Sequence, residues 1–221
     1  MGLIRPMDTQ LFITFFTLVT TLITALNRPA LPRAKILSSV QYSLSNRYED
    51  VSVNQVFAHN ILLTLAYMSG KAGKTKNLSW QAVKKPASFR LTLKPGKTFA
   101  FHDEILEKYK DKVTTTTNAH FNSNEGFLSD GWLVGDGVCH LASFMNVVAR
   151  SAGLQVEAPV RHDFARIAEV DKKDGVSIYY TPTNPQSSQL QNLYITNTRT
   201  KPIAFVFSHK GDSLDIQVQE L

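Results

Sequence analysis

The sequence predicts an α+β domain in which an antiparallel sheet packs against a buried central helix, with a transmembrane or signal helix at the N-terminus. Three patterns lead to this fold class. An uncharged apolar run comes first, helical spacing follows it, and alternating strand patterns fill the last third of the chain. We therefore expect a membrane anchor or signal segment at residues 1–27, a flexible tether at 28–48 and one folded domain at 49–221.

The apolar run predicts contact with a membrane. Residues 11–26 carry no charge and would span roughly 24 Å as a helix, so the wider segment 10–27 is needed to cross a hydrocarbon core of about 30 Å. A single-pass anchor with the domain outside the cell membrane fits this segment, as does a signal peptide whose cleavage leaves a secreted domain. A buried core helix is the third alternative. The orientation stays open, because the residues after the run are more basic than those before it.

The segment between the apolar run and the domain has the composition of a tether. Pro29 and Pro32 are followed by a serine-rich stretch that ends near Asn46. Prolines and serines of this kind are typical of an extended linker.

Two segments of the domain have the pattern of helices. Apolar residues recur at helical spacing over 53–68, with Ser52 as the expected N-cap and Gly70 at the stop position. Residues 139–152 are nearly all apolar or small, which predicts a helix buried on all sides. The polar and basic stretch 71–87 is expected to be an exposed insertion.

The remaining patterns predict strands and turns. Residues 88–93 alternate, a short charged helix is expected after Phe101, and Asp130-Gly131 is a favoured two-residue hairpin turn. The strands expected after the buried helix are 155–160, 164–170, 176–180, 193–196, 203–208 and 214–218.

Charge and motifs limit the classes of partner. The net charge of +6 favours peptidoglycan or another anionic wall polymer as a partner, although ordinary solubility explains the charge equally well. The basic residues are scattered without aromatic RNA-binding motifs or a recognition helix, so we expect no nucleic-acid partner. No HExxH, paired Cys/His, phosphate-loop or GxSxG motif occurs, so we expect no metal site and no cofactor.

Cys139 is the only cysteine of the chain and the strongest candidate for chemistry. It opens the expected buried helix directly after Gly135-Asp136-Gly137, where the positive end of the helix dipole would stabilise a thiolate nucleophile. His162, on the following strand, is the candidate base. A cysteine that serves only as a small buried apolar side chain fits the same pattern, as does one that forms an intermolecular disulfide.

The group that would orient His162 has two candidates, Asp174 and Asn192. If 164–170 pairs with 176–180, Asp174 lies at the turn of that hairpin, about 20 Å from His162 at ~3.3 Å per residue. Asp174 is then a structural residue. Asn192 opens the next strand at the His162 end of the hairpin and would accept the imidazole N–H, as in Cys-His-Asn enzymes.

Five stretches of the sequence together resemble the VanW-like family, named after an accessory protein of vancomycin-resistance clusters. The stretches are LKPGKTFAF, NEGFLSDGWLVGDGVCHLAS, SAGLQVEAPVRHDF, DGVSIYY and NLYITNTRTKPIAFVF. The resemblance covers roughly residues 50–221 and includes the family's cysteine. Asp136, His140 and Asn192 stand where the family usually has glycine, glutamine and aspartate. His140 is a secondary candidate beside the thiol, as are Asp136 and Asp174.

The resemblance implies a bacterial cell-envelope protein and leaves its reaction open. The first hypothesis is a thiol hydrolase or transpeptidase-like enzyme acting on peptidoglycan peptides, similar in architecture to transglutaminase-like enzymes. In it Cys139 attacks, His162 transfers the proton and Asn192 orients the imidazole. The alternative is a non-catalytic wall-binding or scaffold module in which Cys139 is structural. A redox-sensitive or disulfide-dimerising thiol is the third hypothesis.

Overall fold

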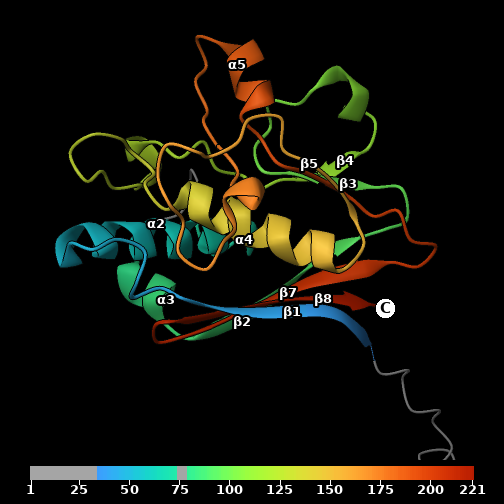
Figure 1. Ribbon diagram of the computed structural model, residues 1–221, viewed down its shortest axis with the longest axis horizontal. Coiled ribbons are helices and arrows are strands. Elements are labelled where there is room, and N and C mark those ends of the chain that lie inside the picture. Colours follow the sequence, from blue (N-terminus) through green and yellow to red (C-terminus); the bar gives the residue numbers. More distant parts are fainter. Residues whose placement is uncertain (1–33, 74–78) are drawn as a thin grey trace, which may run out of the picture. The chain divides into compact units, whose positions relative to one another are not determined.

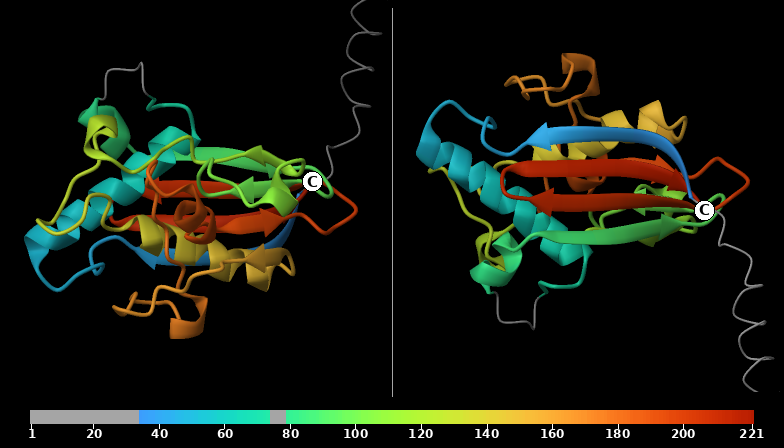
Figure 2. Two further views of the ribbon diagram at one scale, coloured as in Figure 1. Left: turned by 90° about the horizontal axis from the view of Figure 1, so that it is seen from above. Right: turned by 90° about the horizontal axis from the view of Figure 1, so that it is seen from below.

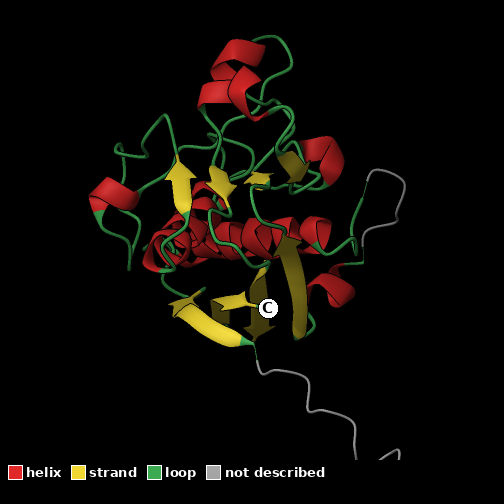
Figure 3. Ribbon diagram, turned by 90° about the vertical axis from the view of Figure 1, so that its right-hand side faces the viewer, coloured by secondary structure: helices red, strands yellow, loops and turns green. Residues whose placement is uncertain are grey.

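The computed structural model describes residues 34–73 and 79–221, and Ala34–Leu221 forms one compact unit. This unit has two four-stranded sheets with helices between them (Figure 1). Figure 3 shows the layers from the side, with the larger sheet below the two long helices and the shorter strands above them. The α+β prediction is confirmed, and the described residues form two sheets where one was expected.

The larger sheet is antiparallel throughout and has the strand order β1-β8-β7-β2. Its strands are β1 (Lys35–Ser43), β2 (Ala87–Leu93), β7 (Ile203–Lys210) and β8 (Ser213–Glu220). The view from below in Figure 2 shows these four strands side by side under the helices. Side chains such as Phe205 and Ile216 alternate along β7 and β8 and are fully buried, so one face of this sheet forms the floor of the core.

The smaller sheet has the order β4-β3-β6-β5 and is parallel only between β3 and β4. Its strands are β3 (Thr98–Ala100), β4 (Val113–Thr115), β5 (Gln155–Glu157) and β6 (Tyr194–Thr196). The expected strand 155–160 ends early, at Glu157, two residues before Pro159, which lacks the N–H that a strand ladder needs.

Two long helices lie between the sheets, α2 (Val51–Met68) and α4 (Val138–Ser151). Helix α4 contacts β1 and β8 on one side and β5 on the other, which confirms the predicted buried helix. Helix α2 also lies where its spacing predicts. Its N-cap is Asp50, whose carboxylate accepts the amides of Ser52 and Val53, so the expectation of Ser52 as the cap is wrong.

Short helical segments complete the unit. They are α3 (Trp80–Lys84), α5 (Pro185–Leu190) and the 3₁₀ turns η1 (Glu107–Tyr109), η2 (Ser123–Glu125) and η3 (Lys172–Asp174). The charged helix expected after Phe101 is the single turn η1. Part of the expected insertion 71–87 forms α3, and Ala72 is buried in the core.

Part of the expected tether is a strand. Residues 35–43 pair along β8 as β1, and Tyr42 on this strand is 1% exposed. The serine-rich composition suggested a linker, but Ser38 lies over α4 and its hydroxyl donates to the carbonyl of Val148 at 2.8 Å. The expected anchor 10–27 and the tether before residue 34 lie outside the described residues. Within 34–73 and 79–221, no helix has the length and apolarity to cross a membrane.

The expected hairpin of 164–170 with 176–180 is wrong, because both segments are loops. Gly175 lies so close to the backbone of His162 that a Cβ atom there would be 2.6 Å from the His162 carbonyl oxygen. Glu169 has a φ of 67°, which no extended strand adopts. The Asp130-Gly131 turn likewise makes only one isolated bridge, between Ser129 and Val134.

Candidate functional site

The N-terminus of α4 opens onto a cavity of about 310 Å³, called here the α4 cavity. Loops from four parts of the chain line it together with the first turn of α4. The lining residues are Arg47, Tyr48, Phe57, Asp130, Trp132, Leu133, Val134, Gly135, Asp136, Gly137, Cys139, His140, His162, Phe164, Ala165, Arg166, Ile178 and Tyr179. Four of the six sequence-predicted site residues are therefore brought together, and Asn192 and Asp174 are not among them.

Gly137 fixes where α4 begins. Its φ is 96°, and a Cβ atom at this position would lie 2.5 Å from the carbonyl oxygen of Phe57 on α2. Only glycine accepts both the left-handed backbone and this close approach. Gly137 is also the N-cap of α4 and has no side chain to bond the first turn, so the start of the helix stays open toward the cavity.

Asn60 holds the loop that carries the cavity's aromatic rim. Its Nδ2 donates to the carbonyls of Leu128 and Asp136, both at 2.9 Å. Its Oδ1 accepts the amide of Leu128, also at 2.9 Å. A fully buried asparagine on α2 thus ties both ends of loop 128–136 to the core.

Two polar residues on α4 place the opposite wall. The hydroxyl of Ser143 accepts the amide of Val176 at 2.9 Å, and Nδ2 of Asn146 donates to the carbonyl of Asp174 at 2.8 Å. These bonds hold residues 174–178 along α4, so that Ile178 lies next to Cys139. Long-range hydrogen bonds to α4 take the place of the expected strand pairing.

The thiol of Cys139 is hydrogen-bonded and neutral. Its Sγ accepts the amide of Ile178 at 3.3 Å and lies 3.6 Å from the Ile178 carbonyl oxygen, to which it donates. Burial raises the pKa of Cys139 to about 11, and the nearby charge of Asp136 raises it further, although the Ile178 amide works in the opposite direction. Burial in this environment therefore favours the neutral thiol, in contrast to the thiolate expected from the helix dipole.

Two buried histidines share the cavity with the thiol. The rings of His140 and His162 have centroids 6.2 Å apart. Burial lowers the pKa of His140 to about 3, with the charge of Arg47 as the second cause, and burial also lowers the pKa of His162. Both imidazoles are therefore neutral at neutral pH, and a neutral imidazole offers one donor and one acceptor nitrogen.

Asn192 contacts His102 and not His162. It is fully buried, and its Oδ1 accepts the amides of Phe101 and His102 at 2.8 and 3.3 Å. Its Nδ2 donates to the carbonyls of His102 and Glu104, and lies 3.3 Å from Nδ1 of His102. These bonds use the whole amide, so the expected role of Asn192 in orienting His162 is wrong. The predicted catalytic triad is not assembled.

The secondary candidates divide between two places. Asp136 lines the α4 cavity and accepts the amide of Asp130 at 3.2 Å, and burial raises its pKa to about 6. Asp174 lies at a neighbouring concavity with Arg150, where the two side chains approach to 3.9 Å. The backbone next to Asp174 lies close to His162, and not at the far end of a hairpin. The amide of His162 donates to the carbonyl of Gly175, the residue that follows Asp174.

Sequence reasoning missed Arg47 and Asn60. Arg47 fell within the expected tether, yet its side chain is fully buried and lines the α4 cavity. Nothing local marks it. Asn60 did carry a signal, because it is a polar residue within the apolar pattern of a helix, and such residues are usually buried with hydrogen-bond partners.

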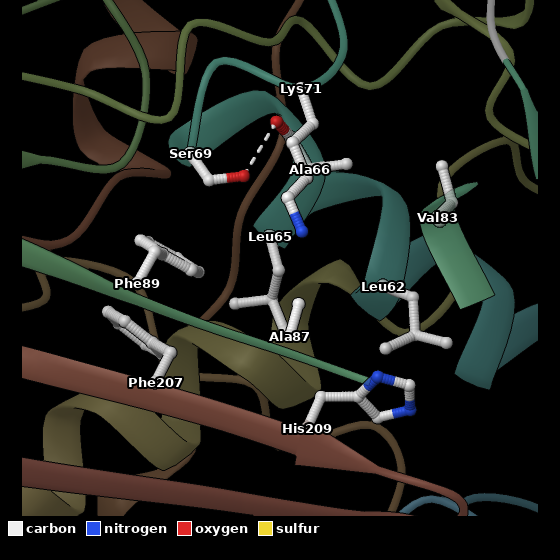
Figure 4. Close-up of a pocket in the computed structure, with 10 residues that line it drawn as sticks. All are labelled: Leu62, Leu65, Ala66, Ser69, Lys71, Val83, Ala87, Phe89, Phe207 and His209. Carbon is white, nitrogen blue, oxygen red and sulfur yellow. Dashed lines mark hydrogen bonds between the residues drawn. The ribbon is translucent and has the colours of Figure 1, made fainter. Parts of the chain in front are cut away.

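A second concavity, between α2 and the larger sheet, is a packing gap (Figure 4). Figure 4 shows Leu62, Leu65 and the stacked rings of Phe89 and Phe207 facing one another, and the space between them measures about 20 Å³. That volume holds about one water molecule. In the part of the chain that is described, no group of three or more His, Cys, Asp or Glu side chains is placed to hold a metal ion.

The chain matches no family model, no curated protein and no solved structure.

Proposed function

We propose that this chain is a cell-envelope protein, held at the membrane through residues 10–27, whose α4 cavity binds a segment of peptidoglycan or another anionic wall polymer. One observation carries the proposal. Among the described residues, eleven large apolar side chains are exposed, and six of them line the α4 cavity. Apolar side chains that gather around one concavity are typical of a binding site, whereas single exposed ones are ordinary.

The chemistry of the rim suits a polymer of sugars and short peptides. Trp132 is 92% exposed and Phe164 is 73% exposed, and both line the cavity with Tyr48 and Tyr179. Flat aromatic faces pack well on the apolar faces of sugar rings, while the tyrosine hydroxyls offer hydrogen bonds. The net charge of +6, with Arg166 at the rim, favours an anionic polymer.

Binding is preferred over catalysis because of the state of Cys139. A neutral thiol bonded to the backbone of Ile178, with Asn192 engaged elsewhere, lacks the ion pair and the oriented base that thiol enzymes use. We therefore propose that Cys139 is a structural residue in the wall of the binding cavity.

The test is co-sedimentation of the purified full chain with insoluble peptidoglycan. The Trp132→Ala/Phe164→Ala double variant removes two exposed rim residues, so we expect unchanged folding and binding weakened about tenfold or more. The matched control is Ile36→Ala/Leu190→Ala, which removes two exposed apolar side chains outside the cavity. Equal binding by all three proteins would remove the basis for the proposal.

Thiol-dependent acyl transfer remains the second candidate, because Cys139 and His162 line the same cavity. Iodoacetamide alkylation of the full chain across a range of pH separates the two functions. A structural thiol should react slowly at neutral pH and accelerate only as the pH approaches 11, with His162→Gln leaving that profile unchanged. An apparent pKa below the ~8.5 of a free cysteine, raised in the variant, would favour the enzyme.

A further inference from the structure

Basic side chains gather where β1 begins, and this part of the domain is called here the basic end. Lys35, the first residue of β1, and Ile203, the first residue of β7, both pair with Glu220 of β8. The β2–β3 and β6–β7 connections lie at the same end and join the larger sheet to the smaller one. The carbonyl of Lys112 accepts the amide of Thr98 at 2.9 Å, where β3 begins. The basic residues of this end are Lys35, Lys94, Lys97, Lys112, Arg199 and Lys201. Figure 2 shows this end of the larger sheet beside the label C.

Asn197 holds the two connections of the basic end together. It is fully buried, and its Nδ2 donates to the carbonyls of Leu93 and Lys201, both at 2.9 Å. Its backbone amide donates to the carbonyl of Lys97 at 3.0 Å, and its carbonyl accepts the amide of Gly96 at 2.8 Å. The basic side chains are therefore carried by a fixed backbone, which lowers the ordering cost of binding a partner.

The charges of the basic end are only partly balanced. Glu220 is shared by two cations, because its carboxylate lies 2.8 Å from Nε of Arg199 and 3.6 Å from Nζ of Lys201. Asp111, which precedes Lys112, is the other acidic side chain there. Within 34–73 and 79–221, no ion pair is formed by Lys35, Lys94, Lys97 or Lys112. Lys97 is half-buried and the other three of these lysines are exposed.

The proposed membrane anchor connects to the domain at this same end. The described residues begin at Ala34, directly before Lys35, and the anchor of the proposed function ends at residue 27. Seven residues reach at most about 25 Å at ~3.6 Å each. The basic end is therefore tethered within about that distance of the membrane surface, and this step rests on the proposed function.

The α4 cavity lies toward the other end of β1. This strand has nine residues and spans about 26 Å at ~3.3 Å per residue. Figure 1 shows β1 running from the basic end toward the start of α2. Arg47 and Tyr48, which line the cavity, follow the far end of the strand. A partner that covered the basic end would leave the cavity open.

We propose that the basic end docks on the anionic lipid headgroups of the membrane that holds the chain, with the α4 cavity on the side away from the lipid. Lysine and arginine donate charge-assisted hydrogen bonds to headgroup phosphates. Each basic residue near an anionic bilayer strengthens attachment roughly fivefold. The bilayer is preferred over the wall polymer as the partner of this end, because the chain keeps it within about 25 Å of the lipid.

The experiment measures lysine acetylation in the full chain reconstituted into lipid nanodiscs. One disc contains phosphatidylcholine alone, and the other contains a mixture of phosphatidylcholine and phosphatidylglycerol. The reagent is N-hydroxysuccinimidyl acetate, which is uncharged, and mass spectrometry gives the rate at each lysine. Lys84 and Lys85 are the internal controls, because both are exposed and precede β2, whereas Lys94 follows it.

The expected result is protection of the basic end by anionic lipid. Lys94, Lys97 and Lys112 should be acetylated at least about threefold more slowly in the anionic discs than in the neutral ones, with Lys84 and Lys85 unchanged. Added salt should remove this protection, because it screens the attraction between exposed charges.

A double variant tests whether the protection comes from these charges. Lys94→Gln/Lys112→Gln should weaken docking about 25-fold, so the remaining lysines of the basic end should lose their protection. Lys84→Gln/Lys85→Gln removes the same charge at the other end of β2 and should keep the protection. Equal rates in the two discs, or protection of Lys84 and Lys85 instead, would overturn the proposal. Protection by peptidoglycan fragments but not by anionic lipid would also overturn it and assign the basic end to the wall polymer.

These outcomes are separable from those of the proposed function. If the chain stays in the discs and binds peptidoglycan through Trp132 and Phe164, yet shows equal acetylation rates in both discs, only the docking fails. If the chain does not stay in the discs, the proposed anchor fails. Sedimentation with anionic and neutral vesicles then tests the basic end by itself, and the absence of a salt-sensitive preference for the anionic vesicles would overturn the docking as well.

Discussion

At Gly137 the chain passes from loop 128–136 into α4, and this residue needs both a left-handed backbone and a close approach to α2. Its φ is 96°, and its Cα faces the carbonyl of Phe57 with room for no further atom. The motif Gly135-Asp136-Gly137 indicated a helix start in the sequence. The contact with α2 could not be predicted, because it joins residues that are 80 positions apart.

Gly137→Ala should be strongly destabilising. The added methyl would meet the Phe57 carbonyl oxygen at 2.5 Å, so we expect a loss of more than about 2 kcal/mol in the free energy of unfolding. Gly131→Ala is the matched control, because Gly131 also has a positive φ, 111°, but a methyl added there would have no atom within 4 Å. Urea unfolding of both variants measures the difference. Equal losses would mean that the close approach to α2 contributes nothing.

The chemistry of Cys139 was the least predictable feature at the residue scale. Its place at the start of a buried helix was predicted from sequence and is confirmed. Its charge state was not, because the dipole contributes only about 0.3–1 kcal/mol at a helix end, less than the 1.36 kcal/mol of one pKa unit. Burial acts in the other direction and is the larger effect, raising the pKa to about 11.

At the scale of elements, β1 joins the larger sheet to the buried helix. The ring of Tyr42 on this strand stacks on Phe144 of α4 with centroids 3.9 Å apart. The Tyr42 hydroxyl donates to the Phe144 carbonyl at 3.4 Å. Residues 35–43, whose composition resembles that of a linker, are therefore part of the core. These contacts fix the strand that precedes Arg47, one of the residues of the α4 cavity.

Tyr42→Ala tests the role of β1 in the core. Removing a fully buried aromatic side chain should cost about 3–5 kcal/mol of stability, measured by denaturant unfolding of the full chain. Ile36→Ala, on the same strand but 56% exposed, should cost less than about 0.5 kcal/mol. If the two variants lost the same small amount, residues 35–43 would behave as the tether that their composition suggested.

The elements predicted correctly are those whose signal is local. Helices α2 and α4 and strands β2, β7 and β8 have the apolar period of their structure within a single window of sequence. The segment 162–180 does not follow this rule. Its path is set by Ser143 and Asn146 on α4 and by the contact of Gly175 with His162, and none of these is visible in the alternation of its own residues.

At the scale of the whole molecule, α4 lies between two sheets, and four of the buried side chains discussed above fall into two separate groups. His140 and His162 line the α4 cavity, while His102 pairs with Asn192, next to the smaller sheet. The sequence placed Asn192 near the correct strand and assigned it to the wrong histidine. The choice between His102 and His162 depends on a second sheet that the strand patterns did not separate from the first.

Burial of these histidines makes stability depend on pH. Burial lowers the pKa of His59 and of His102 to about 4 and that of His140 to about 3, from an ordinary value of 6.5, so below pH 6.5 the unfolded chain binds protons that the folded chain does not. Each of these three groups should remove about 1.4 kcal/mol per pH unit as the pH falls from 6.5 to 4. Asp136, whose pKa is raised to about 6, acts in the opposite direction, but it is one group against three.

Urea unfolding at a series of pH values measures this dependence. The free energy of unfolding should fall steadily from pH 6.5 to pH 4, and His140→Gln should make the slope shallower by about 1.4 kcal/mol per pH unit. If the free energy of unfolding stayed constant or increased as the pH fell from 6.5 to 4, the histidines would have to be protonated in the folded chain.

If the α4 cavity binds a wall polymer, the polymer should contact the residues that line this cavity. Backbone amide shifts of the full chain, recorded by NMR as soluble peptidoglycan fragments are added, locate that contact. We expect shifts at 130–137, 162–166 and 178–179, with none on the outer face of the larger sheet. Shifts confined to that outer face, or no shifts at saturating fragment, would contradict it.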